Sequence, residues 1–371
     1  MSIRFAVPLA AFFVATLMSC GLHAQANVKR WEATQSWRVD GSEAGEPFAD
    51  LRDYVLLKNG HLWALDFKDQ NIRRYDTDGK FLSLVGRKGA GPGEMQNANG
   101  MAVAPDGTVW VNDPSNARIN VYGADGKFMR QISRSAGGYG YRWDGWFGRK
   151  NGELVERPIG GTTPVWQRYD AKGTAIGDMP YTACAAAGTA PEYIRAETPK
   201  QGAMTGSYPF SMGGGLAANG IDGVWCAAPR STRVALIRYG GLDTIAQTTL
   251  EIPNIVVGSD ERTSEIARVE KMISKYATNN FDKSKIPVTK PGIAALQVDD
   301  DGRLWVQHAN RFNQNSTTFD VFDAKSKHLA RVVLPVKQST AMPVRARGNL
   351  LWLTVLDEDD VPSIVQFRIR N

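Results

Sequence analysis

The stretch NGHLWALDFKDQNIRRYDTDGKFLSLVG, Asn59 to Gly86, recurs further along the chain as DGTVWVNDPSNARINVYGADGKFMRQIS, Asp106 to Ser133. The two copies align without a gap, so that Trp63 falls on Trp110 and the offset is 110 − 63 = 47 residues. Both copies contain the tetrapeptide DGKF. A sequence that repeats at a fixed period of this size predicts an array of similar units, each a small group of secondary-structure elements.

Weaker copies continue the pattern and bring the number of units to six. They keep parts of the tryptophan and Asp-Gly or Asn-Gly pattern and cover residues 151–173, 222–241, 301–326 and 348–369. The third unit departs most, because Val155 stands where the others carry tryptophan. Within a unit, runs rich in Val, Ile, Trp and Tyr alternate with turn sequences, which predicts four short strands. Four-stranded units at a period of about 40 to 50 residues are typical of a β-propeller.

The two ends of the chain are predicted to complete the last unit together. The sixth unit runs out after its third strand, PSIVQFRIRN, and the missing outer strand is TQSWRVDG, Thr34 to Gly41. Pairing these segments closes the ring and removes open sheet edges. The predicted fold is therefore all-β: a single six-bladed β-propeller of four-stranded blades over residues 27–371, closed by an N-terminal strand.

One segment carries a family resemblance. GPGEMQNANGMAVAPDGTVWVNDPSNARINVYGADGKF, Gly91 to Phe128, resembles the NHL-repeat family and the related six-bladed propellers that bacteria export. The resemblance is strong over Leu51 to Ile132 and fades to the Trp and Asp-Gly landmarks elsewhere. It implies a binding face at the turns between second and third strands. The family includes lyases whose metal sites depend on several histidines, whereas the mature chain keeps only His61, His308 and His328.

The glycine-rich stretch from Gly86 to Asn99 has two interpretations. Its glycines suggest a phosphate-binding loop, but it lacks the GK[ST] ending and opens no helix. We therefore predict that it joins the outer strand of one blade to the inner strand of the next, with Pro92 fixing one turn.

The chain begins with the pattern of an export signal. Arg4 precedes an apolar run, Phe5 to Met18, which is followed by AQA at Ala24 to Ala26, a small-residue cleavage site. Residues 1–26 are therefore predicted to be removed, which makes the protein periplasmic or secreted. Alternatively, LMSC makes Cys20 a lipidation site, although Met18 fits that pattern poorly, and the protein is then lipid-anchored to the cell envelope.

Composition narrows the class of partner. The formal net charge of +6 is spread along the 371 residues rather than gathered in blocks, so no nucleic-acid partner is predicted. No later apolar run approaches the roughly 20 residues that span a bilayer. In an oxidising compartment Cys184 and Cys226 either form a disulfide or remain separate buried thiols.

Two long insertions, residues 182–210 and 254–290, interrupt the repeat after the third and fourth units. The second contains a predicted helix that is capped by Ser259 and has acidic residues in its first turn. Its apolar stripe consists of Ile266, Val269, Met272, Ile273 and Tyr276. The helix either packs on the rim and shields blades 4 and 5 or forms a lid over the central channel.

Polar residues that the alignment places on the loop-rich face form the candidate ligand-binding site. Arginines suit anionic groups, and tryptophan offers a stacking surface. The candidates are Asp66, Asp113, Arg142, Trp143, Asp144, Glu156, Arg157, Arg230, Lys290, His308, Arg311 and Asp357. Asp66 and Asp113 share one repeated position, and the alternative for them is a side-chain cap on the following turn.

The predicted function is binding or scaffolding, with a polar ligand or a protein partner on this face. The alternative is a metal-dependent lyase or hydrolase acting on a sugar or peptide. It requires a divalent ion at the channel mouth, held by His308 with some of Asp66, Asp113, Glu156 and Asp357. The acidic runs at 299–302 and 357–360 lack the spacing of a calcium-binding loop. No other cofactor is predicted.

Overall fold

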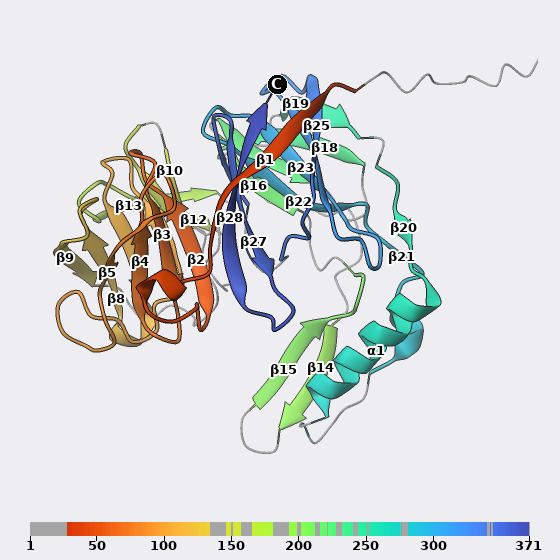
Figure 1. Ribbon diagram of the computed structural model, residues 1–371, viewed down its shortest axis with the longest axis horizontal. Helices are drawn as coiled ribbons and strands as arrows, with labels where there is room; N and C mark the ends of the chain where they lie inside the picture. The colour runs from red at the N-terminus through yellow and green to blue at the C-terminus, as the bar shows by residue number, and fades with distance from the viewer. Residues whose placement is uncertain are drawn as a thin grey trace, which may run out of the picture.

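The structure is a computed structural model, which describes residues 28–133, 146–149, 151–156, 165–180, 193–198, 202–211, 216–220, 222–227, 232–239, 244–250, 252–274, 276, 281–339, 342 and 344–370. Within these residues the chain is mostly β, with one α-helix. Its strands form several small sheets in which strands consecutive in sequence lie side by side (Figure 1).

Four sheets have four strands each and coincide with the first four copies of the repeat, so we call them units 1 to 4. Unit 1 contains β2 (Leu51–Leu56), β3 (Leu62–Asp66), β4 (Asn71–Tyr75) and β5 (Phe81–Val85). Unit 2 contains β6 (Met101–Val103), β7 (Val109–Asp113), β8 (Arg118–Tyr122) and β9 (Phe128–Ser133). Unit 3 contains β10 (Trp146–Gly148), β11 (Leu154–Glu156), β12 (Val165–Tyr169) and β13 (Ala175–Pro180). Unit 4 contains β16 (Leu216–Asn219), β17 (Gly223–Ala227), β18 (Arg233–Arg238) and β19 (Thr244–Thr249).

An eight-stranded sheet contains the last two copies. Unit 5 is β22 (Ile293–Val298), β23 (Leu304–His308), β24 (Thr317–Phe322) and β25 (His328–Leu334). Unit 6 is β26 (Arg345–Arg347), β27 (Leu350–Leu356), β28 (Pro362–Arg370) and β1 (Arg30–Val39). β1 runs antiparallel to β28, and its first residues also pair in parallel with β25, where Arg30 lies opposite Arg331. The predicted pairing of the N-terminal strand with the last strand is confirmed.

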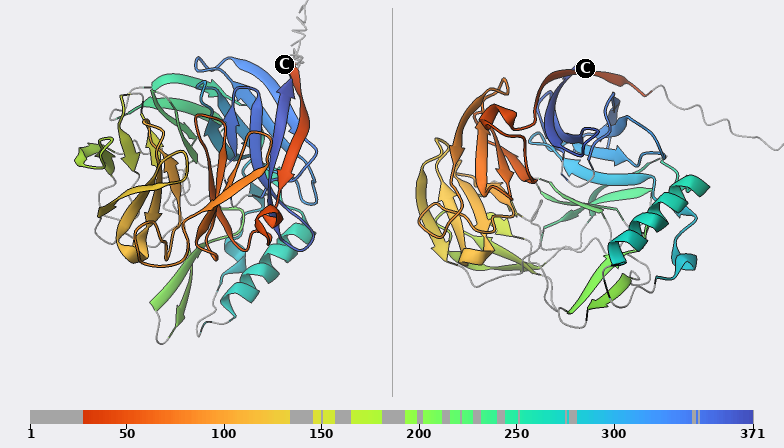
Figure 2. Two further views of the ribbon diagram at one scale, coloured as in Figure 1. Left: turned by 60° about the vertical axis from the view of Figure 1, so that its left-hand side comes forward. Right: turned by 60° about the horizontal axis from the view of Figure 1, so that its bottom comes forward.

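The hydrophobic core lies between the sheets. Each inter-sheet cluster of buried apolar side chains draws on two units that are neighbours in sequence, and one cluster joins unit 6 back to unit 1. Aromatic contacts repeat across these junctions: Trp63 meets Tyr122 edge-on with ring centroids 6.4 Å apart, and Trp110 meets Tyr169 at 6.3 Å. The return of the last unit to the first gives a β-propeller-like architecture (Figure 2).

Unit 3 lacks a tryptophan on its second strand and supplies one from its third. Val155 on β11 is buried, and Trp166 on β12 lies in the same cluster. Trp166 meets Tyr239 of unit 4 with ring centroids 5.2 Å apart, which repeats the contact between the earlier units. The departure noted in the sequence is therefore compensated from the neighbouring strand.

The glycine-rich stretch joins β5 to β6, as predicted. A backbone bridge pairs Lys88 with Met95, whose side chain is buried between units 1 and 2. Gly86 has a φ of +70°, which favours glycine, and a Cβ there would lie 2.3 Å from the terminal methyl of Met95, which would have to move. The stretch therefore connects units 1 and 2 and contributes the Met95 side chain to the core between them.

The two insertions fold together into one small body, which we call the cap module. It consists of the hairpin β14 (Tyr193–Thr198) and β15 (Gly202–Ser207), the helix α1 (Ser259–Ile273), the ribbon β20 (Ile255–Val256) with β21 (Thr289–Lys290), and the 3₁₀ turn η3 (Lys283–Lys285). One apolar cluster holds it together, in which Ile194 and Tyr208 of the first insertion pack with Val269 and Ile273 of α1. Figure 1 shows α1 beside the hairpin, below the sheets.

The apolar stripe of α1 is confirmed, but its partner differs from the prediction. The stripe is buried against the other insertion, and that cluster includes no residue of the described strands of units 4 and 5. The prediction that it shields these two units is therefore wrong. Gly258, not Ser259, is the N-cap, and the Ser259 hydroxyl donates to Asp260. Among the described residues, no helix has the length and apolar character needed to cross a bilayer.

The cap module lies at one end of the sheets, and the start of β1 and the end of β28 lie at the other (Figure 1). In unit 1 the N–H of Phe67, directly after β3, donates to the carbonyl of Asp50, directly before β2. Second strands therefore end beside the connector that enters the unit, and we call this end the cap face. β1 begins where β28 ends, with Glu32 opposite Arg370, on the side away from α1 (Figures 1 and 2).

Candidate functional site

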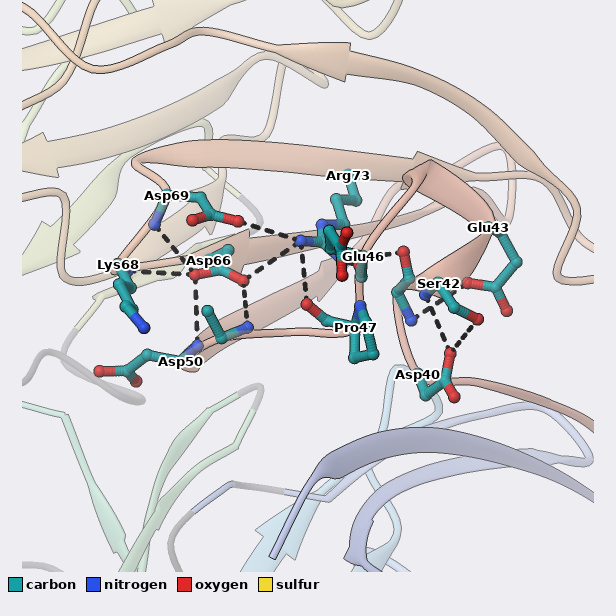
Figure 3. Close-up of polar contacts among 12 residues, drawn as sticks. Asp40, Ser42, Glu43, Glu46, Pro47, Asp50, Asp66, Lys68, Asp69 and Arg73 are labelled. Carbon is teal, nitrogen blue, oxygen red and sulfur yellow. Dashed lines mark hydrogen bonds and ion pairs between the residues drawn. The ribbon is translucent and has the colours of Figure 1, made fainter. Parts of the chain in front are cut away.

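Unit 1 shows how the cap face holds an incoming connector (Figure 3). Asp66, the last residue of β3, is completely buried, and its carboxylate accepts N–H hydrogen bonds from Ala49 at 2.8 Å and Asp50 at 3.3 Å. It also accepts from Lys68 at 3.1 Å and Asp69 at 3.2 Å in the following turn. Asp66 thus fixes the connector and the turn together, which is a structural role.

Arg73 of β4, the third strand of unit 1, also binds the connector. Its guanidinium donates to the carbonyls of Gly41 at 2.8 Å and Glu46 at 2.6 Å, and it forms an ion pair with Asp66 at 3.4 Å. The Arg73 side chain is only 3% exposed. Its charge is therefore used within the fold and does not face a ligand.

Unit 2 uses the same device. Asp113, the last residue of β7, accepts N–H hydrogen bonds from Gln96 at 3.2 Å and Asn97 at 3.0 Å. Arg118 of β8 donates to the carbonyl of Gly91 at 2.7 Å. The interpretation of the repeated aspartate as a cap on the following turn is confirmed for Asp66. Asp113 makes no such bond to the backbone of its following turn, where it accepts only from the side-chain amide of Asn116 at 2.6 Å.

Unit 5 breaks the pattern at the same position. His308 ends β23 three residues after Trp305, as Asp66 ends β3 three residues after Trp63. The connector differs as well. In units 1 and 2 the residue 17 positions earlier donates its N–H to the aspartate, whereas the residue 17 positions before His308 is Pro291, which has no N–H. A carboxylate at this position would lack that donor.

The carboxylate of unit 5 lies instead on the third strand. Asp320 of β24 is opposite Val306, the residue after the tryptophan of β23, just as Arg73 is opposite Ala64 in unit 1. The charges of the device are therefore reversed. In unit 1 an acid ends the second strand and a base lies on the third, and in unit 5 the base ends the second strand and the acid lies on the third.

Asp320 is buried, and two basic side chains, His308 and Arg331, bind its carboxylate. Its oxygens lie 2.8 Å from Nε2 of His308 and 2.9 Å from both Nε and Nη2 of Arg331. Burial by itself would raise the pKa of Asp320, but the hydrogen bonds from His308 and Arg331 outweigh burial and hold that pKa well below its usual range. An ionised carboxylate can only accept, so Nε2 of His308 carries the proton.

His308 is held at one edge and open at the other. Its side chain is 20% exposed. In the part of the chain that the structure describes, nothing hydrogen-bonds to Nδ1 of His308. With Nε2 protonated, Nδ1 carries a lone pair that can accept a proton or a hydrogen bond.

A second histidine belongs to this cluster, and sequence reasoning missed it. Nε2 of His328, at the start of β25, lies 3.2 Å from Asp320, and its ring stacks on Phe322 with centroids 4.7 Å apart. The alignment placed His328 correctly at the start of a fourth strand. The pairing of β24 with β25 then brings it beside Asp320. The sequence signal that pointed to this cluster was His308, which stands where units 1 and 2 have the repeated aspartate.

The residues proposed for a divalent ion do not fit a metal site. Among the described residues, no group of three His, Cys, Asp or Glu side chains is placed to hold a metal ion. The two repeated aspartates are used by backbone N–H groups, Glu156 accepts from the hydroxyl of Tyr169 at 2.9 Å, and Asp357 accepts from its own hairpin turn. The guanidinium of Arg331 also opposes a cation beside Asp320.

Two further candidates lie on the cap face. Lys290 of β21 forms an ion pair with Glu261 in the first turn of α1, and both side chains are largely buried, so this pair ties the helix to the ribbon. Arg311 is exposed in the loop after β23, where its N–H donates to Gln314 at 3.0 Å. The remaining candidates, Arg142, Trp143, Asp144, Arg157 and Arg230, lie outside the described residues.

The cysteines are partly described. Cys226 on β17 is disulfide-bonded. Cys184 and the lipidation candidate Cys20 lie outside the described residues, as does the whole predicted signal segment, 1–26.

The exposed large apolar side chains among the described residues belong to two groups of elements. One set lies on the outer strands. The other lies on the cap face near units 5 and 6: Val256 and Val288 at the ribbon of the cap module are 76% and 74% exposed, and Phe312 and Leu356 in the loop after β23 and at the end of β27 are 45% and 46% exposed. The second set belongs to the cap module and to the cap-face ends of units 5 and 6.

Sequence comparison identifies no relative: no family model matches the chain, and no curated protein matches it. Solved structures show distant similarity of fold. Virginiamycin B lyase from Staphylococcus aureus is 12% identical, with a TM-score of 0.49, over 91% of this chain and 99% of that chain.

Two other solved structures are at a similar distance. A gluconolactonase from Xanthomonas campestris is 11% identical, with a TM-score of 0.42, over 87% of this chain and 88% of that chain. Regucalcin from Agrobacterium tumefaciens, a calcium-binding protein, is 10% identical, with a TM-score of 0.43, over 92% of this chain and 97% of that chain. Identities this low carry no activity over to this chain.

Proposed function

We propose that this protein is an exported binding module that recognises a protein partner on its cap face, between the cap module and units 5 and 6. The observation that carries the proposal is the set of exposed apolar side chains there. Single exposed apolar residues are ordinary, but several at the same end of a molecule favour an interaction surface at that end. Val256, Val288, Phe312 and Leu356 form this set.

The polar groups near this set support the same conclusion. In units 1 and 2 the cap-face aspartates and arginines are used internally. In unit 5, His308 keeps a ring nitrogen open, and Arg311 is exposed, with its backbone N–H donating to Gln314 at 3.0 Å. An apolar centre with a few polar groups at its edge is the usual composition of a protein interface.

The blade count belongs to this proposal. We count the eight-stranded sheet as two blades, since it consists of two four-stranded meanders that β1 joins. With the four separate sheets this makes six blades of four strands. The inter-sheet clusters support the count, because each links consecutive units and one returns from unit 6 to unit 1.

The position of the N-terminus bears on localisation. β1 begins at the end opposite the cap face, so a chain anchored through Cys20 would direct the cap face away from the membrane. A Cys184–Cys226 disulfide would tie the first insertion to unit 4 and fits an oxidising compartment. Mass spectrometry of the exported protein tests both points, because it distinguishes cleavage after Ala26 from a lipidated Cys20 and identifies the disulfide-linked peptides.

Site-specific photo-crosslinking in the native host tests the binding face. A photoreactive residue at Phe312 should give a discrete adduct, whereas the same residue at Met129, an exposed position on the outer strand of unit 2, should not. Adding Val256→Asp and Val288→Asp should abolish the Phe312 adduct without lowering the melting temperature, since both side chains are exposed. Equal adducts at Phe312 and Met129, or an adduct that survives the aspartates, would contradict the proposal.

A second function is favoured by one specific observation, the His308–Asp320 pair. A buried carboxylate that orients an imidazole with one free nitrogen is an arrangement suited to general acid–base catalysis. In this alternative the protein is a hydrolase or lyase acting on a sugar or peptide, and Nδ1 of His308 takes the proton. The described residues do not supply a metal site for it.

Turnover of chromogenic glycosides and peptide esters tests the enzyme alternative. If His308 is the base, His308→Ala should lower kcat by about 10²-fold or more. Lys325→Ala, a change in the exposed turn between β24 and β25 of the same unit, is the matched control and should leave kcat within a few fold. Turnover that is equal in wild type and His308→Ala would remove the alternative, and so would the absence of turnover on the whole panel.

A further inference from the structure

The outer strands of units 1 to 5 follow a pattern with one exception. The second residue of each strand is apolar: Leu82, Met129, Ile176, Ile245 and Leu329. The fourth residue is polar in units 2 to 5, where it is Gln131, Asp178, Gln247 and Arg331. In unit 1 the fourth residue is Leu84.

Leu84 is not there to fill the core. It is 49% exposed, and Leu82 is 41% exposed. Ser83 between them faces the other way, where its hydroxyl accepts a hydrogen bond from Arg74 at 3.2 Å, so the two leucines share the opposite face of β5. A departure from the repeat that exposes apolar surface without a packing gain indicates a function.

The edge of β5 also lacks a paired strand among the described residues, and the 3₁₀ turn η1 (Ser42–Ala44) lies close to this strand. β5 is the last strand of its sheet, and in the described part of the chain no strand pairs with its outer edge. Its sequence, FLSLV, contains no charge and no proline, which are the residues that usually guard an exposed edge. The corresponding strand of unit 5 is partly covered by β1, and that of unit 2 carries Arg130, which donates to the next unit.

We propose that β5 pairs with β5 of a second copy of this chain, antiparallel, across a two-fold axis at Ser83. The sequence FLSLV reads almost identically in both directions. Two-fold pairing therefore places Leu82 opposite the partner's Leu84, and Leu84 opposite the partner's Leu82, so that four leucines form one apolar patch. A second copy is the occupant that this symmetry selects, because another partner would have no need of a palindromic edge.

Sedimentation velocity over a range of concentrations tests the dimer. The mature wild-type protein should dimerise. Leu84→Gln, which gives unit 1 the residue type of units 2 and 4, should raise the dimer Kd about tenfold or more. The matched control Met129→Gln changes an exposed residue on the outer strand of unit 2 and should leave the Kd unchanged. A wild-type monomer at the highest concentration, or equal effects of the two variants, would overturn the proposal.

A disulfide cross-link tests the register. Opposite residues of an antiparallel pair have Cα atoms about 4.5 to 5.5 Å apart, within the span of about 4.4 to 6.8 Å that a disulfide bridges. Ser83→Cys should therefore oxidise to a covalent dimer, and Arg130→Cys, at the same position of β9, should not. Adding Leu84→Gln should slow the Ser83→Cys cross-link. A wild-type dimer in which Ser83→Cys does not cross-link would place the contact elsewhere and refute this geometry.

Discussion

Units 2 and 5 are built from the same repeat, but they treat the chain that enters them in opposite ways. In unit 2, Asp113 accepts two N–H groups of the connector, and Arg118 holds its carbonyls. In unit 5 the connector contains the helix and the ribbon of the cap module, Pro291 offers no N–H, and His308 pairs with Asp320. The last residue of the second strand thus holds the connector in unit 2. In unit 5, where the connector packs in the core of the cap module, the residue at that position does not hold it.

The largest expected effect separates the two units directly. Asp113→Ala should lower the free energy of unfolding by about 4 kcal/mol, because it removes the acceptor of two partly buried N–H groups of the connector and the acidic partner of Arg118. His308→Ala, at the same position of unit 5, should cost less than about 1 kcal/mol, since Arg331 still pairs with Asp320. Urea unfolding of both variants measures the difference. Equal losses would break the comparison.

A second test concerns the connector of unit 5. Ile273→Ala should lower the local opening free energy of the cap module by about 3 kcal/mol, because Ile273 is buried in the cluster that holds the two insertions together. Hydrogen exchange should show this loss in β14 and β15 and no change in β7. If protection fell equally in both, the cap module would not be a separate cooperative body.

A pH-dependent test uses Asp320. Its folded-state pKa lies below the usual value, so it stabilises the fold above its unfolded pKa of about 3.9 and loses this contribution as the pH falls toward the folded value. Asp320→Asn should therefore cost about 2 kcal/mol at pH 7. Urea unfolding from neutral to acidic pH should show this difference shrinking below about pH 4. A difference that grows on acidification would contradict the assigned ionisation.

The smallest expected effect concerns the residue that ends the third strand, which is Tyr122 in unit 2. Tyr122 of unit 2 donates its hydroxyl to the carbonyl of Gly93 at 2.8 Å, and burial raises its pKa. Unit 5 has Phe322 at the equivalent position. Tyr122→Phe should cost about 1 kcal/mol, since the ring still packs on Trp63. Thermal unfolding measures this loss, and a variant as stable as wild type would show that the connector of unit 2 does not need this bond.

Much of the fold was predictable because the same pattern of strands and turns recurs along the chain. The period of Trp63 and Trp110, together with the Asp-Gly turns, identifies the strands, and the incomplete last unit identifies the pairing of the two chain ends. The capping role of Asp66 was also predictable, because an aspartate after a strand serves nearby N–H groups wherever the same turn recurs.

The candidate site was less predictable. His308 is predicted on the ligand-binding face, and only the enzyme alternative places it on a metal, with carboxylates that the fold uses elsewhere. Its true partner, Asp320, lies on the next strand, and nothing local in the sequence distinguishes that aspartate from one in a solvent-exposed turn. The registers of β23 with β24 and of β24 with β25 bring His308, Asp320 and Arg331 together.

Local patterns and their repetition were enough for the strands, the turns, the joints between units and the apolar stripe of α1, since each depends on residues close together in the chain. The partners of the less regular parts came only from the tertiary structure. The stripe of α1 meets a hairpin from the other insertion, and His308 meets an acid on the neighbouring strand, because these contacts join segments whose spacing follows no period. A repeat can be extrapolated from one unit to the next, whereas its exceptions must be located in space.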